Sequence, residues 1–233
     1  MEKIYTIPVN DAFNEDDGCP FCRMKKKLEC DEVDLILGAS MMEPDIRIKT
    51  NEKGFCSKHF GDLLCGKKRL PLALMLESHL NEILKDCATP LVSLKGRVNT
   101  VASNCDSFCN TCYICEKVEF HLSKMFETAC YLWENDPDFR KKYTNRKFFC
   151  LPCYTKLLKT AKGVMSKKQL EQFLKISQEI EMNFLETLKN DVSWFCKKFD
   201  YRFEDEPWGN SKDSVERTIK FLCGDNAVPE ADK

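Results

Sequence analysis

The sequence of 233 residues has no long apolar run. Its first eight residues, Met1 to Pro8, include no apolar core of the length that a secretory signal peptide needs. Nowhere does the chain approach the ~20 consecutive apolar residues that span a bilayer. We therefore expect a cytoplasmic protein with no membrane partner.

The chain also has almost no net charge. Lys and Arg total 36 against 37 Asp and Glu, a formal net charge of −1, which gives no overall attraction to nucleic acid or to an anionic membrane. Short basic clusters occur, for example at residues 25–27 and 67–69. Acidic residues surround the first of them, and such clusters are typical of solvated helix faces. We do not expect nucleic-acid binding, although a folded chain could combine clusters on one face.

Catalytic patterns are missing as well. The chain has three histidines and no GxSxG, HExxH or P-loop sequence, so no catalytic group of residues emerges and we do not expect an enzyme. His79 lies on the apolar stripe of a predicted helix, which favours a core histidine with a hydrogen-bond partner over a ligand or a base. His121 lies beside another such stripe.

Alternation of apolar and polar residues is nearly absent, whereas helical spacing is common, so the sequence predicts an all-α helical bundle. Residues 1–18 are expected to be extended and residues 41–54 to form a loop. A long helix near the C-terminus starts at a capping box formed by Ser166 and Gln169. The other predicted helices cover residues 20–37, 56–65, 70–86 and 112–133, a short turn from 136, and helices from 150 and from 212 to Gly224.

Cysteine, in contrast, is abundant, with fifteen residues. In a reducing compartment, paired cysteines bind metal or perform redox chemistry more often than they form disulfides. Eight Cys and His residues form four duos with two residues between the members of each, and every duo lies at a predicted helix start. The duos are Cys19 with Cys22, Cys56 with His59, Cys112 with Cys115, and Cys150 with Cys153.

The four duos follow an internal repeat. Between Cys22 and Cys56 lie 33 residues, and between Cys115 and Cys150 lie 34. The intervening residues also match, since Glu-Pro-Asp-Ile-Arg at 43–47 corresponds to Asp-Pro-Asp-Phe-Arg at 136–140. The sequence predicts a duplication: a first copy over 1–88, a connection over 89–111, and a second copy with the C-terminal helices over 112–233, all packed as one unit.

Each copy is predicted to hold one zinc ion. Tetrahedral zinc takes four sulfur or nitrogen donors, and a CxxC duo supplies two that converge on one point. The first predicted site combines the duos at 19–22 and 56–59, and the second combines those at 112–115 and 150–153. Because His59 corresponds to Cys153, and zinc accepts either donor whereas a disulfide cannot use histidine, metal binding is favoured. Four donors with no open position indicate structural sites.

Other chemistries remain open for these cysteines. Cys19-Pro-Phe-Cys22 resembles the glutaredoxin redox motif, and Cys105, Cys109 and Cys112 form a CxxxCxxC resembling the radical-SAM cluster motif. Both folds need alternating strands and helices. An iron–sulfur cluster could occupy a four-ligand site, and Cys105 or Cys109 could replace a ligand of the second site.

The remaining cysteines and one aromatic segment are harder to assign. The eight cysteines outside the predicted sites lie mostly in apolar helical patterns and are expected to be small buried hydrophobes. Residues 194–210 are rich in aromatics. They either strap the last helix onto the bundle or form a partner groove that includes Arg202.

Three segments carry a family resemblance: Gly54-Phe-Cys-Ser-Lys-His-Phe60, residues 71–80, and residues 198–213. Over nearly its whole length the chain resembles an uncharacterised bacterial family of cytoplasmic cysteine-rich proteins, a domain of unknown function. Members often have histidine where this chain has Cys153, a change that preserves metal binding but alters the charge of the site. The resemblance implies one architectural unit and no activity.

Three hypotheses for function follow. The first is a zinc-stabilised interaction or adaptor module that binds a protein partner. The second is a redox protein, either a sensor that releases zinc or an iron–sulfur electron carrier. The third is an enzyme with a pocket between the halves, near His79 and Arg202.

Overall fold

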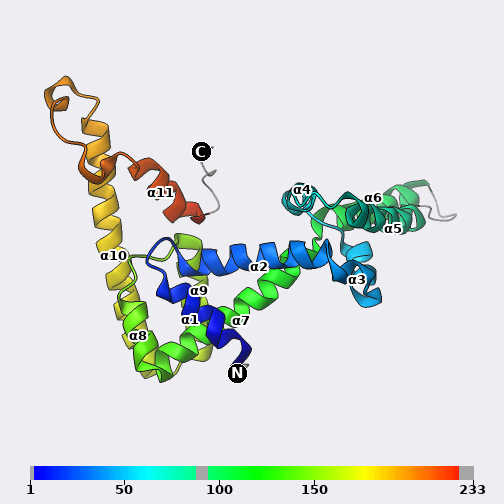
Figure 1. The fold of residues 1–233 in the computed structure, drawn as a ribbon, viewed down its shortest axis with the longest axis horizontal. Helices are drawn as coiled ribbons and strands as arrows, with labels where there is room; N and C mark the ends of the chain where they lie inside the picture. The colour runs from blue at the N-terminus through cyan, green and yellow to red at the C-terminus, as the bar shows by residue number, and fades with distance from the viewer. Residues whose placement is uncertain (1–2, 88–93, 226–233) are drawn as a thin grey trace. The chain divides into compact units, whose positions relative to one another are not determined.

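Every regular element of the described residues is helical. The structure, a computed structural model, describes residues 3–87 and 94–225, and within these ranges it contains no β-strand, which confirms the all-α prediction. The α-helices (Figure 1) are α1 Thr6–Asn14, α2 Pro20–Ile36, α3 Pro44–Lys53, α4 Ser57–Cys65, α5 Arg69–Cys87, α6 Leu94–Asn110, α7 Tyr113–Asn135, α8 Pro137–Thr144, α9 Leu151–Val164, α10 Lys167–Lys197 and α11 Ser214–Cys223. Short 3₁₀ turns cover Lys3–Tyr5, Ala39–Met42, Tyr201–Phe203 and Gly209–Ser211.

The chain forms two compact units. Unit 1 comprises Met1–Lys26 and Leu122–Lys233, and unit 2 comprises Lys27–His121. Both boundaries fall inside helices, α2 and α7. The units therefore divide the chain differently from the predicted halves. The described part of the predicted connection at 89–111 consists mainly of α6, which belongs to unit 2.

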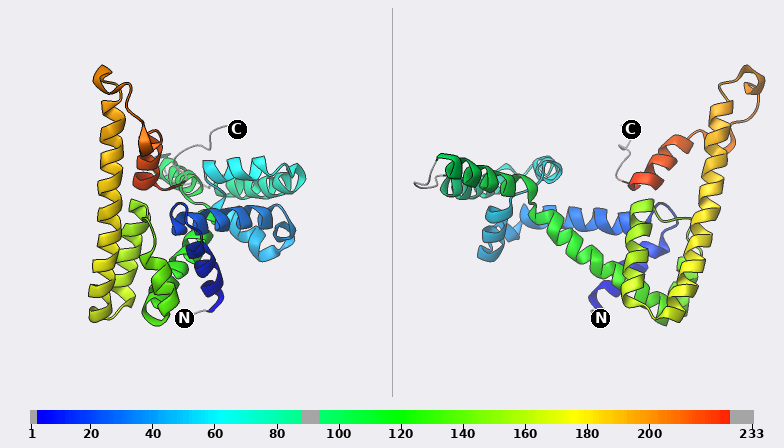
Figure 2. Two further views of the ribbon diagram at one scale, coloured as in Figure 1. Left: turned by 60° about the vertical axis from the view of Figure 1, so that its left-hand side comes forward. Right: turned by 180° about the vertical axis from the view of Figure 1, so that it is seen from behind.

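Aromatic side chains dominate the core of unit 1. Phe21 stacks on Phe126 with their ring centroids 3.9 Å apart, and Phe13 packs against Phe21, Phe139 and Phe149. Around this core, α10 contacts α8, α9 and α11 (Figure 2). The predicted N-cap of α10 is present, because the Ser166 hydroxyl oxygen accepts a hydrogen bond from the Gln169 amide.

The core of unit 2 is aliphatic. It is built around Ile36 from the end of α2, Leu63 from α4, Leu72 from α5 and Ile114 from the start of α7. Helix α5 packs against α3, α4 and α6. The starts of α4 and α7 are thus held in one core.

Two non-helical predictions were wrong. Residues 6–14 form α1, and residues 44–53 form α3. Proline interrupts a helix interior but fits the first turn of a helix, so a helix is possible in both places. Pro8 lies in the first turn of α1, and Pro44 is the first residue of α3.

Within residues 3–87 and 94–225, none of the helices is both long and apolar enough to cross a bilayer.

Candidate metal centres

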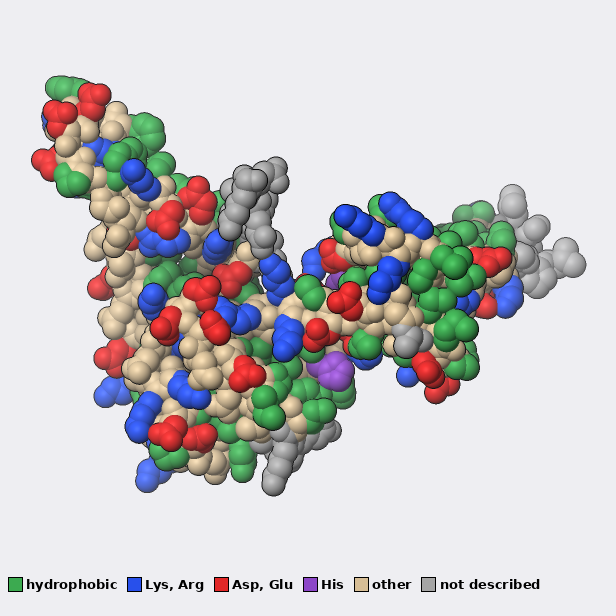
Figure 3. Space-filling view, in the orientation of Figure 1, with side chains coloured by type: hydrophobic (Ala, Val, Ile, Leu, Met, Phe, Trp, Pro, Cys, Tyr) green, Lys and Arg blue, Asp and Glu red, His purple; other side chains and the backbone are tan. Residues whose placement is uncertain are grey.

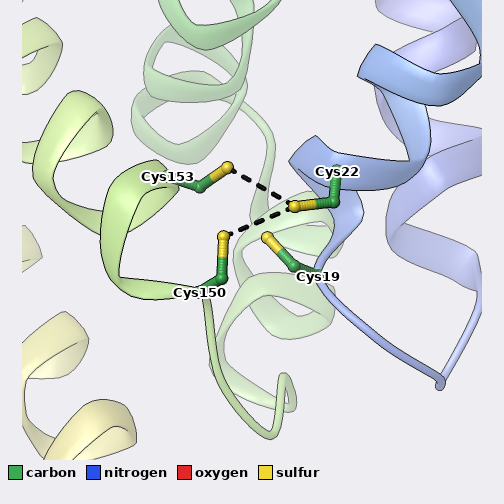
Figure 4. Close-up of side chains that lie close together, drawn as sticks. All are labelled: Cys19, Cys22, Cys150 and Cys153. Carbon is green, nitrogen blue, oxygen red and sulfur yellow. Dashed lines mark hydrogen bonds between the residues drawn. The ribbon is translucent and has the colours of Figure 1, made fainter. Parts of the chain in front are cut away.

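Unit 1 contains a group of four thiols that we name cluster one: Cys19, Cys22, Cys150 and Cys153. Their sulfur atoms all lie within 4.8 Å of one another. The Cys22 sulfur is 3.4 Å from that of Cys150 and 3.9 Å from that of Cys153 (Figure 4). One duo comes from the start of α2 and the other from the start of α9. The cluster therefore joins two segments that are more than half the chain apart.

The end of α11 closes over cluster one. The Cys19 amide donates a hydrogen bond to the Asp225 carboxylate, with a nitrogen–oxygen distance of 2.9 Å. Gly224 has φ +94°, and a β-carbon there would lie 3.3 Å from the Cys22 sulfur. Both the backbone conformation and the close approach favour glycine.

Two charged side chains fix the loops that carry the duos of cluster one. The Arg146 guanidinium donates hydrogen bonds to the carbonyl oxygens of Glu15 and Gly18, immediately before Cys19. The Glu181 carboxylate accepts a hydrogen bond from the Phe149 amide at 2.8 Å, immediately before Cys150. Burial raises the pKa of Glu181 to about 7.

Three thiols of cluster one are buried and Cys153 is half-buried, and the four thiols compete for ionisation. Cys19 and Cys150 are fully inaccessible to solvent. Burial raises the pKa of Cys19, and the neighbouring Cys150 thiol raises that of Cys153, whereas hydrogen bonds from Cys150 and Cys153 lower the pKa of Cys22. A divalent cation is the partner that permits several thiolates in such a site.

Unit 2 contains the second group, which we name cluster two: Cys56, His59, Cys112 and Cys115. The His59 Nδ1 atom is 3.3 Å from the Cys56 sulfur, 3.3 Å from that of Cys112 and 3.4 Å from that of Cys115. One duo lies at the start of α4 and the other at the start of α7. Nδ1 is therefore the histidine atom directed at the centre of the cluster.

The opposite side of the His59 ring faces a carboxylate. Its Nε2 atom is 3.8 Å from an oxygen of Glu29, which also pairs with Lys58. Glu29 is largely buried. A carboxylate behind a metal-binding histidine fixes the ring orientation and makes the nitrogen a stronger donor.

Cluster two also depends on a close backbone contact. The Tyr113 amide donates to the Gly54 carbonyl oxygen at 3.0 Å, which ties the segment before Cys56 to the start of α7. Gly54 has φ +56°, and a β-carbon there would lie 2.6 Å from the Nε2 atom of His79. The His79 Nδ1 atom lies 2.6 Å from the carbonyl oxygen of Asn51. His79 is thus a structural histidine with a hydrogen-bond partner, as expected.

Cluster two is more accessible than cluster one. Cys115 is exposed and Cys56 is half-buried, whereas His59 and Cys112 are buried. Partial burial acts to raise the pKa of Cys56, but hydrogen bonds from the His59 amide and the Cys115 thiol outweigh it and lower this pKa. Burial and the nearby Cys112 thiol raise the pKa of Cys115 to about 12.

Both clusters have the dimensions of a tetrahedral thiolate site. With Zn–S bonds of about 2.3 Å, ideal tetrahedral geometry places two sulfur ligands about 3.8 Å apart. The sulfur–sulfur distances of 3.4, 3.8 and 3.9 Å agree with this spacing. Each cluster could hold a metal ion through four protein donors.

The structure overturns the predicted pairing of the duos. All eight predicted donors lie in the two clusters, but Cys19 and Cys22 meet Cys150 and Cys153, not Cys56 and His59. Likewise, Cys112 and Cys115 meet the duo at 56–59. The pairing is nested: the inner two duos form one cluster and the outer two form the other. The start of α2 lies beside the start of α9, and the start of α4 lies beside the start of α7.

The remaining cysteines also differ from expectation. Of the eight outside the clusters, only Cys130 is buried, and burial raises its pKa to about 12. Cys30, Cys65, Cys105, Cys109, Cys196 and Cys223 are exposed, and Cys87 is half-buried. The prediction of buried hydrophobes was wrong for these seven, because on a surface helix a cysteine fits an apolar pattern without facing the core.

The other residues considered for function have local roles. Arg202 pairs with Asp200 on an exposed turn, and Cys105 lies beside Cys87 and takes no part in cluster two. The glutaredoxin and radical-SAM folds both require strands, which are absent from residues 3–87 and 94–225. Neither redox motif therefore has its structural context.

These observations define an all-α protein with two cysteine-rich clusters that could hold metal ions. The chain belongs to DUF6062, a family of unknown function whose model matches residues 1–229. The expected resemblance to an uncharacterised, cysteine-rich family is thereby confirmed. Neither the curated proteins nor the solved structures gave a match.

Proposed function

We propose that this protein is a helical scaffold stabilised by two zinc ions, one in each cluster, and that it acts as a non-catalytic interaction or adaptor module. The observation that carries the proposal is the convergence of four donors in each cluster from segments far apart in sequence. A metal ion at such a point cross-links the fold, and its binding energy becomes folding energy.

The donor sets favour zinc over an iron–sulfur cluster. Cluster two includes a histidine, which zinc accepts as readily as thiolate and which most iron–sulfur clusters do not use. In cluster one the four sulfurs surround a single point at the spacing of one tetrahedral ion. Four protein donors leave no open position for substrate, which supports a structural role.

The turn that follows α10 supports an interaction role. The Lys198 ammonium group donates hydrogen bonds to the carbonyl oxygens of Phe203, Glu204 and Glu206, which holds the turn in shape. On this turn Phe199 is 76% exposed and Tyr201 is 83% exposed. Figure 3 shows hydrophobic and acidic side chains beside one another at this tip.

The chemistry of this turn fits a basic segment of a protein partner. Glu204, Asp205 and Glu206 are exposed beside the two aromatic rings. Carboxylates attract Lys and Arg, and the exposed rings offer cation–π contacts. The indole nitrogen of the nearby Trp194 is instead used within the segment, where it donates a hydrogen bond to the Pro207 carbonyl oxygen.

A lysine- and arginine-rich synthetic peptide tests this surface. We expect it to change the fluorescence of Trp208, which packs against Phe195 and Phe199. The double substitution Phe199→Ala/Tyr201→Ala should weaken binding about tenfold or more. Phe120→Ala, which removes an exposed ring on α7, is the matched control and should bind normally. Equal affinity of the double variant, or of an acidic peptide, would exclude this docking surface.

The accessibility of cluster two favours one alternative function, a redox sensor that releases zinc. Cys115 and Cys56 are within reach of solvent and hence of an oxidant. Thiolates that lose electrons to form a disulfide no longer bind zinc. An electron carrier with an iron–sulfur cluster is a further alternative of the same class.

Metal analysis with an absorption spectrum, on protein purified without air, tests the proposal. We expect a colourless protein that binds two zinc ions per chain, and Cys30→Ala should leave this number unchanged because Cys30 is an exposed cysteine outside both clusters. A brown protein containing iron would refute the zinc assignment. Reversible loss of one zinc ion on oxidation would favour the sensor.

A further inference from the structure

A further pair of thiols lies close together in unit 2, outside both clusters. The sulfur atoms of Cys87 and Cys105 are 3.8 Å apart. Cys87 is the last residue of α5, and Cys105 lies within α6. Both are accessible, since Cys105 is exposed and Cys87 is half-buried.

The packing of α5 against α6 holds this pair in place. The Asn104 side-chain amide donates a hydrogen bond to the carbonyl oxygen of Asp86 at 2.8 Å. Each of these residues directly precedes one of the two cysteines. A second contact joins the helices nearby, where the rings of His79 and Phe108 meet with centroids 5.6 Å apart. The two thiols are therefore neighbours because their backbones are fixed.

The separation of the two sulfurs suits reversible bond formation. A disulfide bond is about 2.05 Å long, so the sulfurs must approach by roughly 1.8 Å from their van der Waals contact. Side-chain rotation provides such a shift, particularly for Cys87 at the end of its helix. The pair belongs to neither metal cluster, so its sulfurs are available for reaction while zinc is bound.

We propose that Cys87 and Cys105 form a site of reversible oxidation that takes a low-molecular-weight disulfide as its substrate. The Cys105 thiolate attacks one sulfur of the small disulfide, which forms a mixed disulfide and releases the first thiolate. Cys87 then attacks the Cys105 sulfur, forms the intramolecular bond and releases the second. The protein loses two electrons and two protons, and the small disulfide is reduced to two thiols.

Two features assign the order of these steps. Cys105 is the more exposed thiol, so an incoming disulfide reaches it first. The neighbouring Cys105 thiol and the Asp86 carboxylate raise the pKa of Cys87, which leaves less of the reactive thiolate at Cys87. Cys87 is thus the resolving residue.

The disulfide would fix the helix that leads into cluster two. Helix α6 ends at Asn110, and the Thr111 hydroxyl donates to the Lys53 carbonyl oxygen at 2.7 Å, one residue before Cys112. Linking α6 to the end of α5 removes conformations of this segment from the unfolded chain. Oxidation at this site is therefore expected to stabilise unit 2, in contrast to oxidation of the zinc ligands.

Peptide mapping by mass spectrometry tests this site. Zinc-loaded, full-length protein is treated with oxidised glutathione, and the alkylated digest is compared with that of the untreated protein. We expect a cross-linked peptide containing Cys87 and Cys105, lighter by two hydrogen atoms, that reverts on reduction. Zinc content, measured in parallel, should not change.

Matched variants separate this pair from its neighbours. Cys87→Ser should accumulate the mixed disulfide at Cys105, whereas Cys105→Ser should form neither product. Cys109→Ser, one helical turn further along α6, should behave as the unaltered protein does. A cross-link to Cys109, loss of zinc during the reaction, or unmodified Cys105 after prolonged treatment would overturn the proposal. The cross-link and the behaviour of the three cysteine variants do not depend on which metal ion the clusters bind, so they test this site separately from the zinc assignment.

Discussion

Replacing both Cys19 and Cys22 by alanine should leave one zinc ion per chain, bound by three sulfurs and one nitrogen. The substitutions remove half of cluster one and leave cluster two, with His59, complete. X-ray absorption distinguishes the ligands, because Zn–N bonds are about 2.0 Å long and Zn–S bonds about 2.3 Å. If the duos paired within each copy instead, the surviving site would contain four cysteines and its spectrum would show sulfur alone.

The reciprocal variant provides the control. Cys112→Ala/Cys115→Ala should retain one zinc ion with four sulfur ligands, since cluster one is then intact. Nested pairing, as in the structure, therefore predicts a nitrogen ligand in the first variant and sulfur alone in the second. Pairing within each predicted copy predicts the reverse. Sulfur-only coordination in the first variant together with a nitrogen ligand in the second would show that the pairing is wrong. Cys150→Ala/Cys153→Ala removes the other half of cluster one and should give the same spectrum as the first variant. Agreement between the two would show that the result does not come from a local folding defect at Cys19 and Cys22.

The sequence predicted the donors of the clusters but not their pairing. Four duos can combine in three ways, and the repeat favoured pairing within a copy. Spacing is a weak guide here, because each doubling of a loop raises the free energy of closure by only about 0.6 kcal/mol. The nested arrangement joins residue 22 to residue 150, and hydrophobic packing easily outweighs the extra loop entropy. The duplication itself stays a prediction.

The lengths of two helices already indicate the nested pairing. Helix α2 has 17 residues and α7 has 23, so at 1.5 Å per residue they extend roughly 25 and 34 Å. Each helix begins at the first duo of a predicted copy, so the chain moves away by the length of the helix before it reaches the second duo of that copy. A short helix could have brought the chain back within one copy, whereas these long ones favour partners from the other copy.

Surface cysteines and prolines account for the other errors. Residues such as Cys105 and Cys109 fit a helical period, yet exposure depends on which neighbouring helix covers them, and a single sequence contains no such information. Pro8 and Pro44 lie in the first turns of α1 and α3, where proline is compatible with a helix, in segments that were not expected to be helical. The aromatic core of unit 1 includes Phe13 from α1, a segment that was not expected to be helical.

Removing zinc should unfold each unit in a cooperative transition of its own. Each structural zinc site contributes on the order of 10 kcal/mol at neutral pH, comparable with the whole stability of a typical domain, about 5 to 15 kcal/mol. Without its metal, cluster one would hold four neighbouring thiols with no ion between them, and Cys19 and Cys150 are inaccessible to solvent. We expect a strong chelator to abolish most of the helical circular-dichroism signal, and added zinc to restore it.

The course of chelation should distinguish the two units. Cluster two, with Cys115 exposed, is expected to lose its ion first, and cluster one, closed by Gly224 and Asp225, to lose it more slowly. Helicity should therefore fall in two phases, each matched by the release of one zinc ion. The variant Cys112→Ala/Cys115→Ala should show only the slow phase. An unchanged helical signal after both ions are removed would mean that the aromatic and aliphatic cores suffice, and the clusters would then require a function other than stability.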